Sequence, residues 1–492
     1  MKGLSALSLA VAAVSAYTPR DYESGFVHQK IMGMKHDIWA RDRAAGLHAP
    51  DRYPSLHNSD WDRDGARRRS DYIKCRNGYV TVEPGNANQT FRCKNMDLYD
   101  FKSHADLGSS EGEGSSSWGW TAADGREFGA IGQADGTAFV ELAPLTGKLQ
   151  YLGRLPQQSV PSIWREIRVL NDICIIGSEA ERHGVQLFDM KKLLDIDPSN
   201  PVTFSTETDV LAVFRGLPVG RTHNIVVNWD LGYAVAVGAQ PRDSTCKSGM
   251  IYIDLSDPSN PTSPGCASDD GYTHDGQCVK YNGPDTRYTG RDICMAYNED
   301  SLTIVDATDK TGKNASTFLG KLYYPGASYT HQGWFINDNH DFLLLDDELD
   351  EIEANGTAAS GIPVTHIVDA SDLHNPKYTG YFHATDCKAI DHNQYVVNGL
   401  TYQSNYGAGL WVHDVTSIPS DPTGSSVDTV AFFDIYPEDD DAEGGGRVEF
   451  VGTWSHFLLP SGHVVINTIE RGVFVAKIPR GRGSGDQPGY PQ

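Results

Sequence analysis

The chain has 492 residues, including 50 Gly and 25 Pro, and 22% of its residues are charged. This length exceeds what one simple core supports, and the composition is typical of a turn-rich β protein, so a helical bundle is disfavoured. The formal net charge of −24 argues against nucleic acid or an anionic membrane as a partner, because both bind clustered Lys and Arg. It suits solubility outside a cell and the capture of cations.

The first 16 residues, MKGLSALSLAVAAVSA, combine one Lys, an apolar stretch and small residues at the end. This pattern predicts a secretory signal peptide that is cleaved before Tyr17, because the apolar stretch is too short to span a bilayer. No later segment approaches about 20 apolar residues. We therefore expect a secreted, extracellular protein that has no membrane partner and is a monomer.

Eight cysteines suit an exported chain, because disulfides form and persist in oxidising compartments. Proximity in the sequence favours three pairs, each closing a short loop worth roughly 3 kcal/mol. These pairs are Cys75 with Cys93, Cys246 with Cys266, and Cys278 with Cys294. We expect Cys174 and Cys387 to be buried thiols.

Residues 17–95 are polar and irregular, with a helical pattern at residues 26–46 and a basic run at Arg67 to Arg69. We interpret them as an N-terminal extension that carries the Cys75–Cys93 loop. The arginine run is either a processing site or a solvated charge cluster. Residues 481–492 are predicted to be a flexible tail. Sequons that would mark exposed loops if glycosylated stand at Asn88, Asn314 and Asn355.

Between residues 96 and 480 one unit recurs, as VQLFDM, MIYIDLSDPSNP, LTIVDATD, THIVDASDLHNP and LWVHDVTS. Each copy reads as a strand that ends in Asp and continues into a turn. The strand-ending residues are Asp189, Asp254, Asp306, Asp369 and Asp414. Their spacing fits four-stranded blades lengthened by loop insertions, and the blade starts number seven, so we predict an all-β, seven-bladed β-propeller. The aspartates are expected to accept from backbone N–H groups two residues on.

Histidines recur near the predicted blade starts, three of them in the Thr-His copies RTHN, YTHDGQ and YTHQGW. The five candidates are His223, His274, His331, His383 and His456. The innermost strands of a propeller face one central channel, so these imidazoles are predicted to form a ring. The ring would either hold a divalent metal such as Zn or Mn or form a hydrogen-bonded plug. No nucleotide cofactor is expected, because no dinucleotide-binding glycine motif or Walker loop is found.

The LTIVD unit and its SDPSNP turn resemble the LVIVD repeat. The run HDGQCVKYNGPDTRYTGRDICMAYNEDSLTIVD, followed by YTHQGWFINDNHDFLLLDDELDE, is similar to the choice-of-anchor B family in its secreted fungal form. The resemblance covers roughly residues 75 to 480. It implies an extracellular seven-bladed β-propeller and implies no particular reaction.

Two functions fit these observations. The first is a non-catalytic propeller that binds a carbohydrate, a cell-wall glycan or a protein at the His-lined channel. The alternative is a metal-dependent polysaccharide lyase, in which the metal neutralises a uronate carboxylate and a base removes the neighbouring proton. Its candidate catalytic residues are Arg165, Glu166 and Tyr329, with Arg165 pairing the acid group of the substrate.

Further candidates concern the ligand and the carboxylates. Residues expected to contact a ligand at the rim are Trp118, Trp120, Trp334, Trp454 and Asp347. A glycoside hydrolase, a less favoured reading, needs two opposed carboxylates, for which the candidates are Glu166, Glu179, Asp347 and Glu470. The acidic run from Asp346 to Glu351 offers the hard oxygen ligands that Ca²⁺ prefers.

Overall fold

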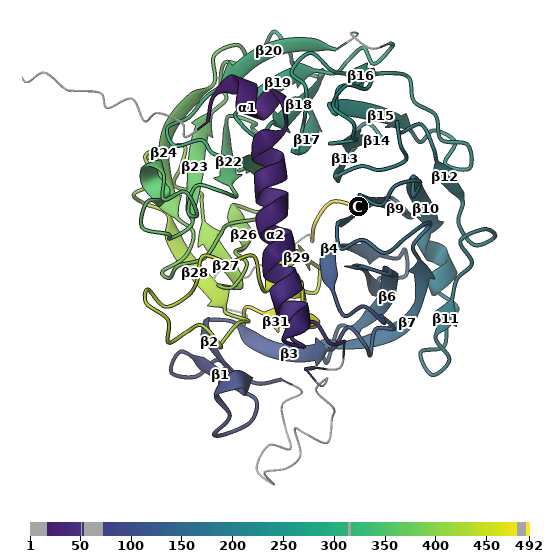
Figure 1. The fold of residues 1–492 in the computed structure, drawn as a ribbon, viewed down its shortest axis with the longest axis vertical. Helices are drawn as coiled ribbons and strands as arrows, with labels where there is room; N and C mark the ends of the chain where they lie inside the picture. Colours follow the sequence, from purple (N-terminus) through teal and green to yellow (C-terminus); the bar gives the residue numbers. More distant parts are fainter. Residues whose placement is uncertain (1–16, 51, 54–71, 313–315, 480–488) are drawn as a thin grey trace, which may run out of the picture.

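The computed structural model describes residues 17–50, 52–53, 72–312, 316–479 and 489–492. Over these residues seven sheets stand around a central axis, which confirms the predicted all-β, seven-bladed β-propeller (Figure 1). The predicted signal peptide, the arginine run and the sequon at Asn314 lie outside the described residues.

Each blade has four antiparallel core strands. The innermost strands are β4 (Gly114–Thr121), β8 (Arg165–Leu170), β13 (Asn224–Asn228), β17 (Asp275–Lys280), β21 (Thr330–Phe335), β25 (Gln394–Val397) and β29 (Thr453–Leu458). The second strands are β5 (Glu127–Gln133), β9 (Ile173–Ser178), β14 (Tyr233–Val237), β18 (Asp292–Tyr297), β22 (Phe342–Asp347), β26 (Leu400–Ser404) and β30 (His463–Thr468). The third strands are β6 (Gly136–Ala143), β10 (Val185–Asp189), β15 (Met250–Asp254), β19 (Leu302–Asp306), β23 (Val364–Asp369), β27 (Leu410–Asp414) and β31 (Val473–Lys477). The fourth strands are β7 (Lys148–Pro156), β12 (Ala212–Phe214), β16 (Cys266–Ala267), β20 (Thr317–Leu322), β24 (Lys377–His383), β28 (Asp428–Phe433) and β3 (Asp97–Lys102).

The ends of the propeller meet in one blade, because β3 pairs with β31 and completes the β29 blade. Two strands from the predicted N-terminal extension, β1 (Tyr79–Thr81) and β2 (Thr90–Lys94), extend the β25 blade through pairing of β2 with β28. The extension is thus partly built into the ring, which corrects the predicted boundary. The remaining short elements are β11 (Val202–Thr203), η1 (Ala87–Gln89), η2 (Met190–Leu193) and η3 (Gly356–Ala358).

The repeated aspartates end the third strands, and their role is the predicted one. Each carboxylate accepts from the backbone N–H two residues on, at 2.9 to 3.1 Å in the five copies. This bond fixes the turn that leads the chain to the fourth strand. The aspartates are therefore structural.

An Asp369→Ala substitution is expected to lower the free energy of unfolding by about 1 kcal/mol, because it removes the bond from Ser371 N to Asp369 Oδ1. Asp369→Asn keeps an acceptor oxygen and is expected to lose less. Thermal unfolding of the two variants checks this. Equal losses would show that the bond does not stabilise the turn.

The three predicted disulfides are all present, joining Cys75 to Cys93, Cys246 to Cys266 and Cys278 to Cys294. Cys174 and Cys387 are free and buried, as expected. The sequon at Asn88 is exposed, but Asn355 Nδ2 already donates to Gly326 O and Ser328 Oγ. A glycan on Asn355 would have to break both bonds.

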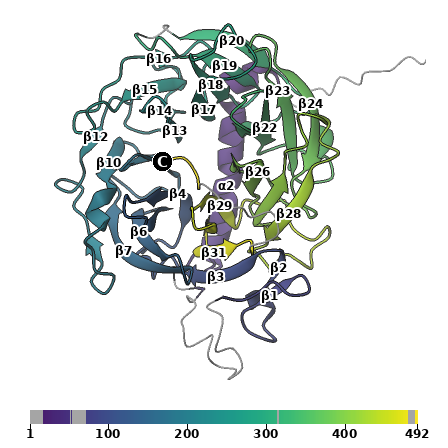
Figure 2. The same cartoon turned by 180° about the vertical axis from the view of Figure 1, so that it is seen from behind.

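Two helices precede the ring, α1 (Pro19–Glu23) and α2 (Phe26–Ala44). Helix α2 lies where the helical pattern at residues 26–46 predicted a helix. Helix α2 crosses one face of the propeller over its central axis (Figures 1 and 2). Trp39 of α2 is fully buried, and its Nε1 donates to Phe450 O at 2.8 Å. No helix in the described part of the chain is long and apolar enough to cross a membrane.

The last four residues lie inside the ring at the other end of the channel (Figure 2). Tyr490 is 4% exposed and packs against Trp118 and Tyr395, while Pro491 O accepts from Trp118 Nε1 at 2.8 Å. Residues 489–492 are therefore packed, contrary to the predicted flexible tail. Helix α2 thus lies over one end of the central axis, and these residues lie at the other end.

Candidate functional site

Four histidines from four successive blades lie side by side beneath α2. They are His223, His274, His331 and His392, and each lies at or just before the start of an innermost strand. Consecutive ring centroids are separated by 4.3, 4.3 and 4.4 Å. The Nε2 atoms of His223 and His274 are only 2.7 Å apart. We call this set the histidine cluster.

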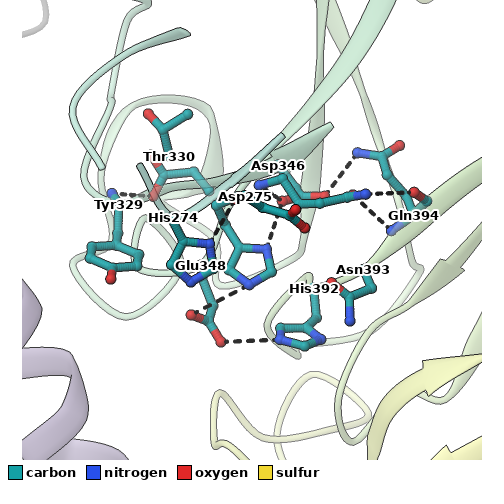
Figure 3. Close-up of polar contacts among 12 residues, drawn as sticks. His274, Asp275, Tyr329, Thr330, Asp346, Glu348, His392, Asn393 and Gln394 are labelled. Atoms are coloured by element: carbon teal, nitrogen blue, oxygen red, sulfur yellow. Dashed lines mark hydrogen bonds and ion pairs between the residues drawn. The ribbon is translucent and has the colours of Figure 1, made fainter. Parts of the chain in front are cut away.

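A buried carboxylate, Glu348, completes the cluster (Figure 3). Its oxygens lie 3.9 Å from Nε2 of His331 and 3.7 Å from Nε2 of His392. One ligand atom from each of His274, His331 and Glu348 falls within 4.8 Å of the other two, and all three residues are buried. Imidazole and carboxylate ligands of this kind suit Zn or Mn.

The second nitrogen of every ring is held by an oxygen. The Nδ1 atoms lie 2.6 Å from Glu179 Oε1 in His223, 2.9 Å from His331 O in His274, 3.1 Å from Asp346 Oδ1 in His331 and 2.6 Å from Trp454 O in His392. An oxygen acceptor favours a proton on Nδ1, which leaves a lone pair on Nε2 of His331 and His392. Between His223 and His274 the 2.7 Å Nε2–Nε2 contact is a hydrogen bond, so one of these two nitrogens carries a proton. Among these rings, His274 and His331 together with Glu348 form a group that could hold a metal ion.

Burial favours the neutral form of His274, His331 and His392. Removal from water lowers the pKa of His274 and His331 well below the ordinary value, and the neighbouring histidines lower it further. The pKa of His392 is lowered to about 4 by burial, although the Glu348 carboxylate opposes this shift. Neutral imidazole is the form that binds a metal, so His274 and His331 with Glu348 could hold a metal ion at neutral pH.

Lys35 of α2 reaches into the same place. Its Nζ lies 2.6 Å from Glu348 Oε1, its side chain is 3% exposed, and it stands over the rings of Phe450 and Trp454. A small cavity remains between Lys35 and the histidines, and the centre of a water molecule can occupy about 10 Å³ of it. This is room for about one water or one small ion. The ammonium group therefore supplies a positive charge beside the metal ligands.

Three of the five predicted metal ligands, His223, His274 and His331, come together as expected, and the prediction for His383 is wrong. His383 is exposed at the end of β24, the outermost strand of its blade. The histidine that the next blade contributes to the cluster is His392, two residues before β25. The signal for it was available: Asn398 and Gly399 form a two-residue hairpin turn, both with positive φ, and this places the innermost strand at Gln394–Val397.

The prediction for His456 is also wrong. His456 lies within β29, two residues after Trp454. Trp454 lines the histidine cavity and His456 does not, so the ring of His456 lies further from α2 along the channel. Nδ1 of His456 bonds Ser404 Oγ at 2.7 Å, and the ring packs against Tyr395 and Tyr490. Burial lowers the pKa of His456 to about 3. It belongs to the packing around the C-terminal residues.

The predicted catalytic residues have different surroundings. Arg165 and Glu166 line the same small cavity as the histidine cluster. Arg165 Nε donates to Gln133 O, but its buried Nη2 has no hydrogen-bond partner among the described residues. Glu166 is paired with Arg168. Tyr329 OH bonds Nδ1 of His28 at 2.8 Å, and burial raises the pKa of Tyr329 well above its usual range, which disfavours it as a base.

The tryptophans predicted to contact ligand are mostly structural. Trp118 and Trp120 are buried, with Nε1 donating to Pro491 O and Asp172 Oδ1 respectively. Trp454 lines the histidine cavity. Trp334 instead lines a separate pocket of about 540 Å³ at the opposite end of the channel.

The candidate carboxylates of a glycoside hydrolase are each engaged elsewhere. Asp347 accepts from Tyr324 OH and from the backbone N–H groups of Ser328 and Tyr329. Glu179 is paired with His223, and Glu470 accepts from Gly452 N. Asp347 therefore holds the chain segment before β21 in position, and it does not have the ligand-contacting role that was predicted for it.

The fold and the cluster together define a seven-bladed β-propeller with a His-His-Glu group that could hold a metal ion. No protein-family model matches the chain, and no curated protein matches its sequence. Similar solved structures include the WD40 β-propeller domain of Doa1, at 8% identity over 79% of this chain and 98% of that chain, with a TM-score of 0.46. Another is the β-propeller domain of Cps50 (Swd1) from Myceliophteria thermophila, at 11% identity over 72% and 93% of the two chains, with a TM-score of 0.43. The resemblance to the choice-of-anchor B family therefore rests on the sequence motifs alone.

Proposed function

We propose that the protein is an extracellular β-propeller that binds one divalent transition metal, Zn or Mn, through the histidine cluster and Glu348. The observation that carries the proposal is that one ligand atom from each of His274, His331 and Glu348 lies within 4.8 Å of the other two, with all three residues buried. Three disulfides favour an oxidising compartment outside the cytosol.

The metal centre would serve to bind a ligand rather than to turn over a substrate. Helix α2 covers the cluster, and the cavity beneath it holds about one small ion. A carbohydrate or protein ligand would meet the metal only where α2 leaves room or moves aside. Membership of the choice-of-anchor B family is part of this proposal and is supported by the LTIVD and SDPSNP repeats.

A metal-dependent polysaccharide lyase is the second candidate, and one observation favours it. Arg165 lines the histidine cavity, and its Nη2 has no hydrogen-bond partner among the described residues. Its guanidinium and a metal could together hold the carboxylate of a uronate there. This reaction requires α2 to leave the face of the propeller. Absorbance of the unsaturated product, measured with uronate polymers, is the test of this candidate.

Elemental analysis of the purified full chain is expected to find about one Zn or Mn per molecule. A His331→Ala variant is expected to lose at least 100-fold in metal affinity, because second-shell changes alone typically cost 10–100-fold and this change removes a ligand. His383→Ala is the matched control, since His383 is exposed and outside the cluster, and it is expected to bind as the native chain does. Equal metal binding by the two variants would overturn the proposed site.

A further inference from the structure

A second pocket lies at the end of the channel opposite α2. Its volume of about 540 Å³ falls within the range of about 300–1,000 Å³ that is typical of small-molecule sites. It is lined by residues from the same four blades that supply the histidine cluster, and by Pro491. In β21, for example, His331 and Trp334 are three residues apart, which is roughly 10 Å along the strand. The pocket is therefore separate from the histidine cluster, and we call it the far pocket.

Two indole rings form the apolar part of the far pocket. The rings belong to Trp229 and Trp334, with centroids 6.1 Å apart and planes inclined by 59°. Trp229 is held in place by stacking on Trp118 and by a bond from its Nε1 to Val169 O at 2.8 Å. Trp334 packs edge-on against Tyr395, with the ring centroids 5.1 Å apart. Two large, fixed aromatic rings thus meet at an angle in the pocket.

Three N–H groups of the lining side chains are free to donate. Gln277 Oε1 accepts from Phe335 N at 2.8 Å, which leaves its Nε2 without a partner among the described residues. Asn337 Oδ1 accepts from Asn339 N at 2.8 Å, and its Nδ2 is likewise unbonded in that part of the chain. The indole N–H of Trp334 makes no hydrogen bond within the described residues. Gln277 and Trp334 are each only 7% exposed, so these donors need a partner from a bound molecule or water.

The charged side chains of the far pocket are acidic. Asp230 and Asp338 both line it and are exposed, so the pocket opens to solvent at this rim. His340 also lines it, and burial lowers the pKa of this histidine, so it adds no positive charge at neutral pH. Among the described residues that line the pocket there is no Lys or Arg. The two carboxylates accept hydrogen bonds and repel an acidic ligand.

Free donors beside carboxylates indicate the class of ligand. A sugar hydroxyl both donates and accepts, so hydroxyls can bond to the carboxylates and to the N–H groups at once. An ammonium group only donates, so it would leave the three N–H groups without acceptors. An acidic sugar would bring its own carboxylate close to Asp230 and Asp338. A neutral sugar, with an apolar C–H face and hydroxyls around its edge, matches both the indoles and the polar groups.

We propose that the far pocket binds a neutral glycan, with one sugar ring packed against the two indoles and its hydroxyls bonded to Gln277, Asn337 and the two aspartates. This site goes beyond the proposed metal centre and does not depend on it. Helix α2 lies over the other end of the central axis, so a glycan reaches the far pocket without displacement of the helix.

The test uses the full chain and neutral hexamers of glucose, mannose and N-acetylglucosamine. At least one of them is expected to bind saturably in titration calorimetry and to shift the tryptophan fluorescence, because the sugar covers indole surface. A hexamer of galacturonate is expected to bind at least tenfold more weakly, because its carboxylates meet Asp230 and Asp338. This comparison is made in the His331→Ala variant, so that the histidine cluster does not contribute.

An Asn337→Asp variant is expected to bind the neutral hexamer at least tenfold more weakly, because a carboxylate replaces the free N–H donor. It keeps the acceptor for Asn339 N and is expected to melt near the native temperature. Asn260→Asp is the matched control, since it makes the same charge change at an exposed turn outside the pocket, and it is expected to bind as the native chain does. Trp334→Phe keeps an aromatic ring but loses the indole N–H, and at least a fivefold loss of affinity is expected.

The glycan site and the metal site fail separately. His331→Ala is expected to lose Zn or Mn and to keep the neutral hexamer, whereas Asn337→Asp is expected to keep the metal. A native chain that binds none of the three neutral hexamers would overturn the glycan site, and so would equal binding by Asn337→Asp and Asn260→Asp. Displacement of the bound hexamer by tetramethylammonium would also overturn it, because the pocket would then be a cation site.

Discussion

Metal binding at the histidine cluster is expected to become at least tenfold tighter in a Lys35→Met variant. The ammonium of Lys35 lies 2.6 Å from Glu348 Oε1, and a bound metal would have to share that carboxylate with it. Two positive charges 4 Å apart repel by about 4 kcal/mol at an effective dielectric constant of 20, so removing one of them favours the other. Titration calorimetry of the full chain with Zn²⁺ or Mn²⁺ measures the change.

The metal-free form of the same variant is expected to lose about 3–5 kcal/mol of stability, because Glu348 is left buried without its partner. Excess metal is expected to restore the lost stability. Lys30→Met is the matched control, since Lys30 lies on the same helix and pairs with Glu353 at a half-exposed position. Metal affinity that is unchanged by Lys35→Met would mean that Lys35 and the metal do not compete.

Docking of α2 on the propeller is expected to depend strongly on Trp39. A Trp39→Ala substitution is expected to cost about 3–5 kcal/mol, because it empties a fully buried site between Trp164 and Trp454 and removes the bond to Phe450 O. Hydrogen exchange is expected to speed up across Phe26–Ala44 and to stay slow in the innermost strands.

Loss of α2 docking in the Trp39→Ala variant would expose the histidine cluster to solvent. Modification of His274 and His331 by diethyl pyrocarbonate, read by mass spectrometry, is expected to rise in the Trp39→Ala variant. Phe26→Ala is the control, because Phe26 is 53% exposed on the same helix and should leave both measurements unchanged. If α2 keeps its protection without Trp39, other contacts hold the helix in place.

The repeat architecture was predictable because five of the seven blades carry an Asp at the end of the third strand. That residue makes a local bond to the backbone two positions on, so its role does not depend on the rest of the fold. The short-range disulfides were predictable for the same reason. Three members of the histidine cluster followed from equivalent positions in successive blades.

The remainder of the site depends on contacts that no local pattern encodes. His392 was missed in favour of His383 because a fixed spacing was applied to a blade whose innermost strand starts later than that spacing predicts. Glu348 and Lys35 come from a turn and from a helix distant in sequence, and they meet the histidines only after the ring has closed. The helix at residues 26–46 was predicted, whereas its position across the channel was not.

The pairing of β3 with β31 also bears on synthesis of the chain. The register joins Asp97 to Lys477, so the last seam of the ring cannot form until nearly the whole polypeptide has left the ribosome. Until then the open edges of the first and last blades offer unpaired backbone groups to other nascent chains. We expect the yield of folded protein to depend on chaperones that shield these edges during synthesis.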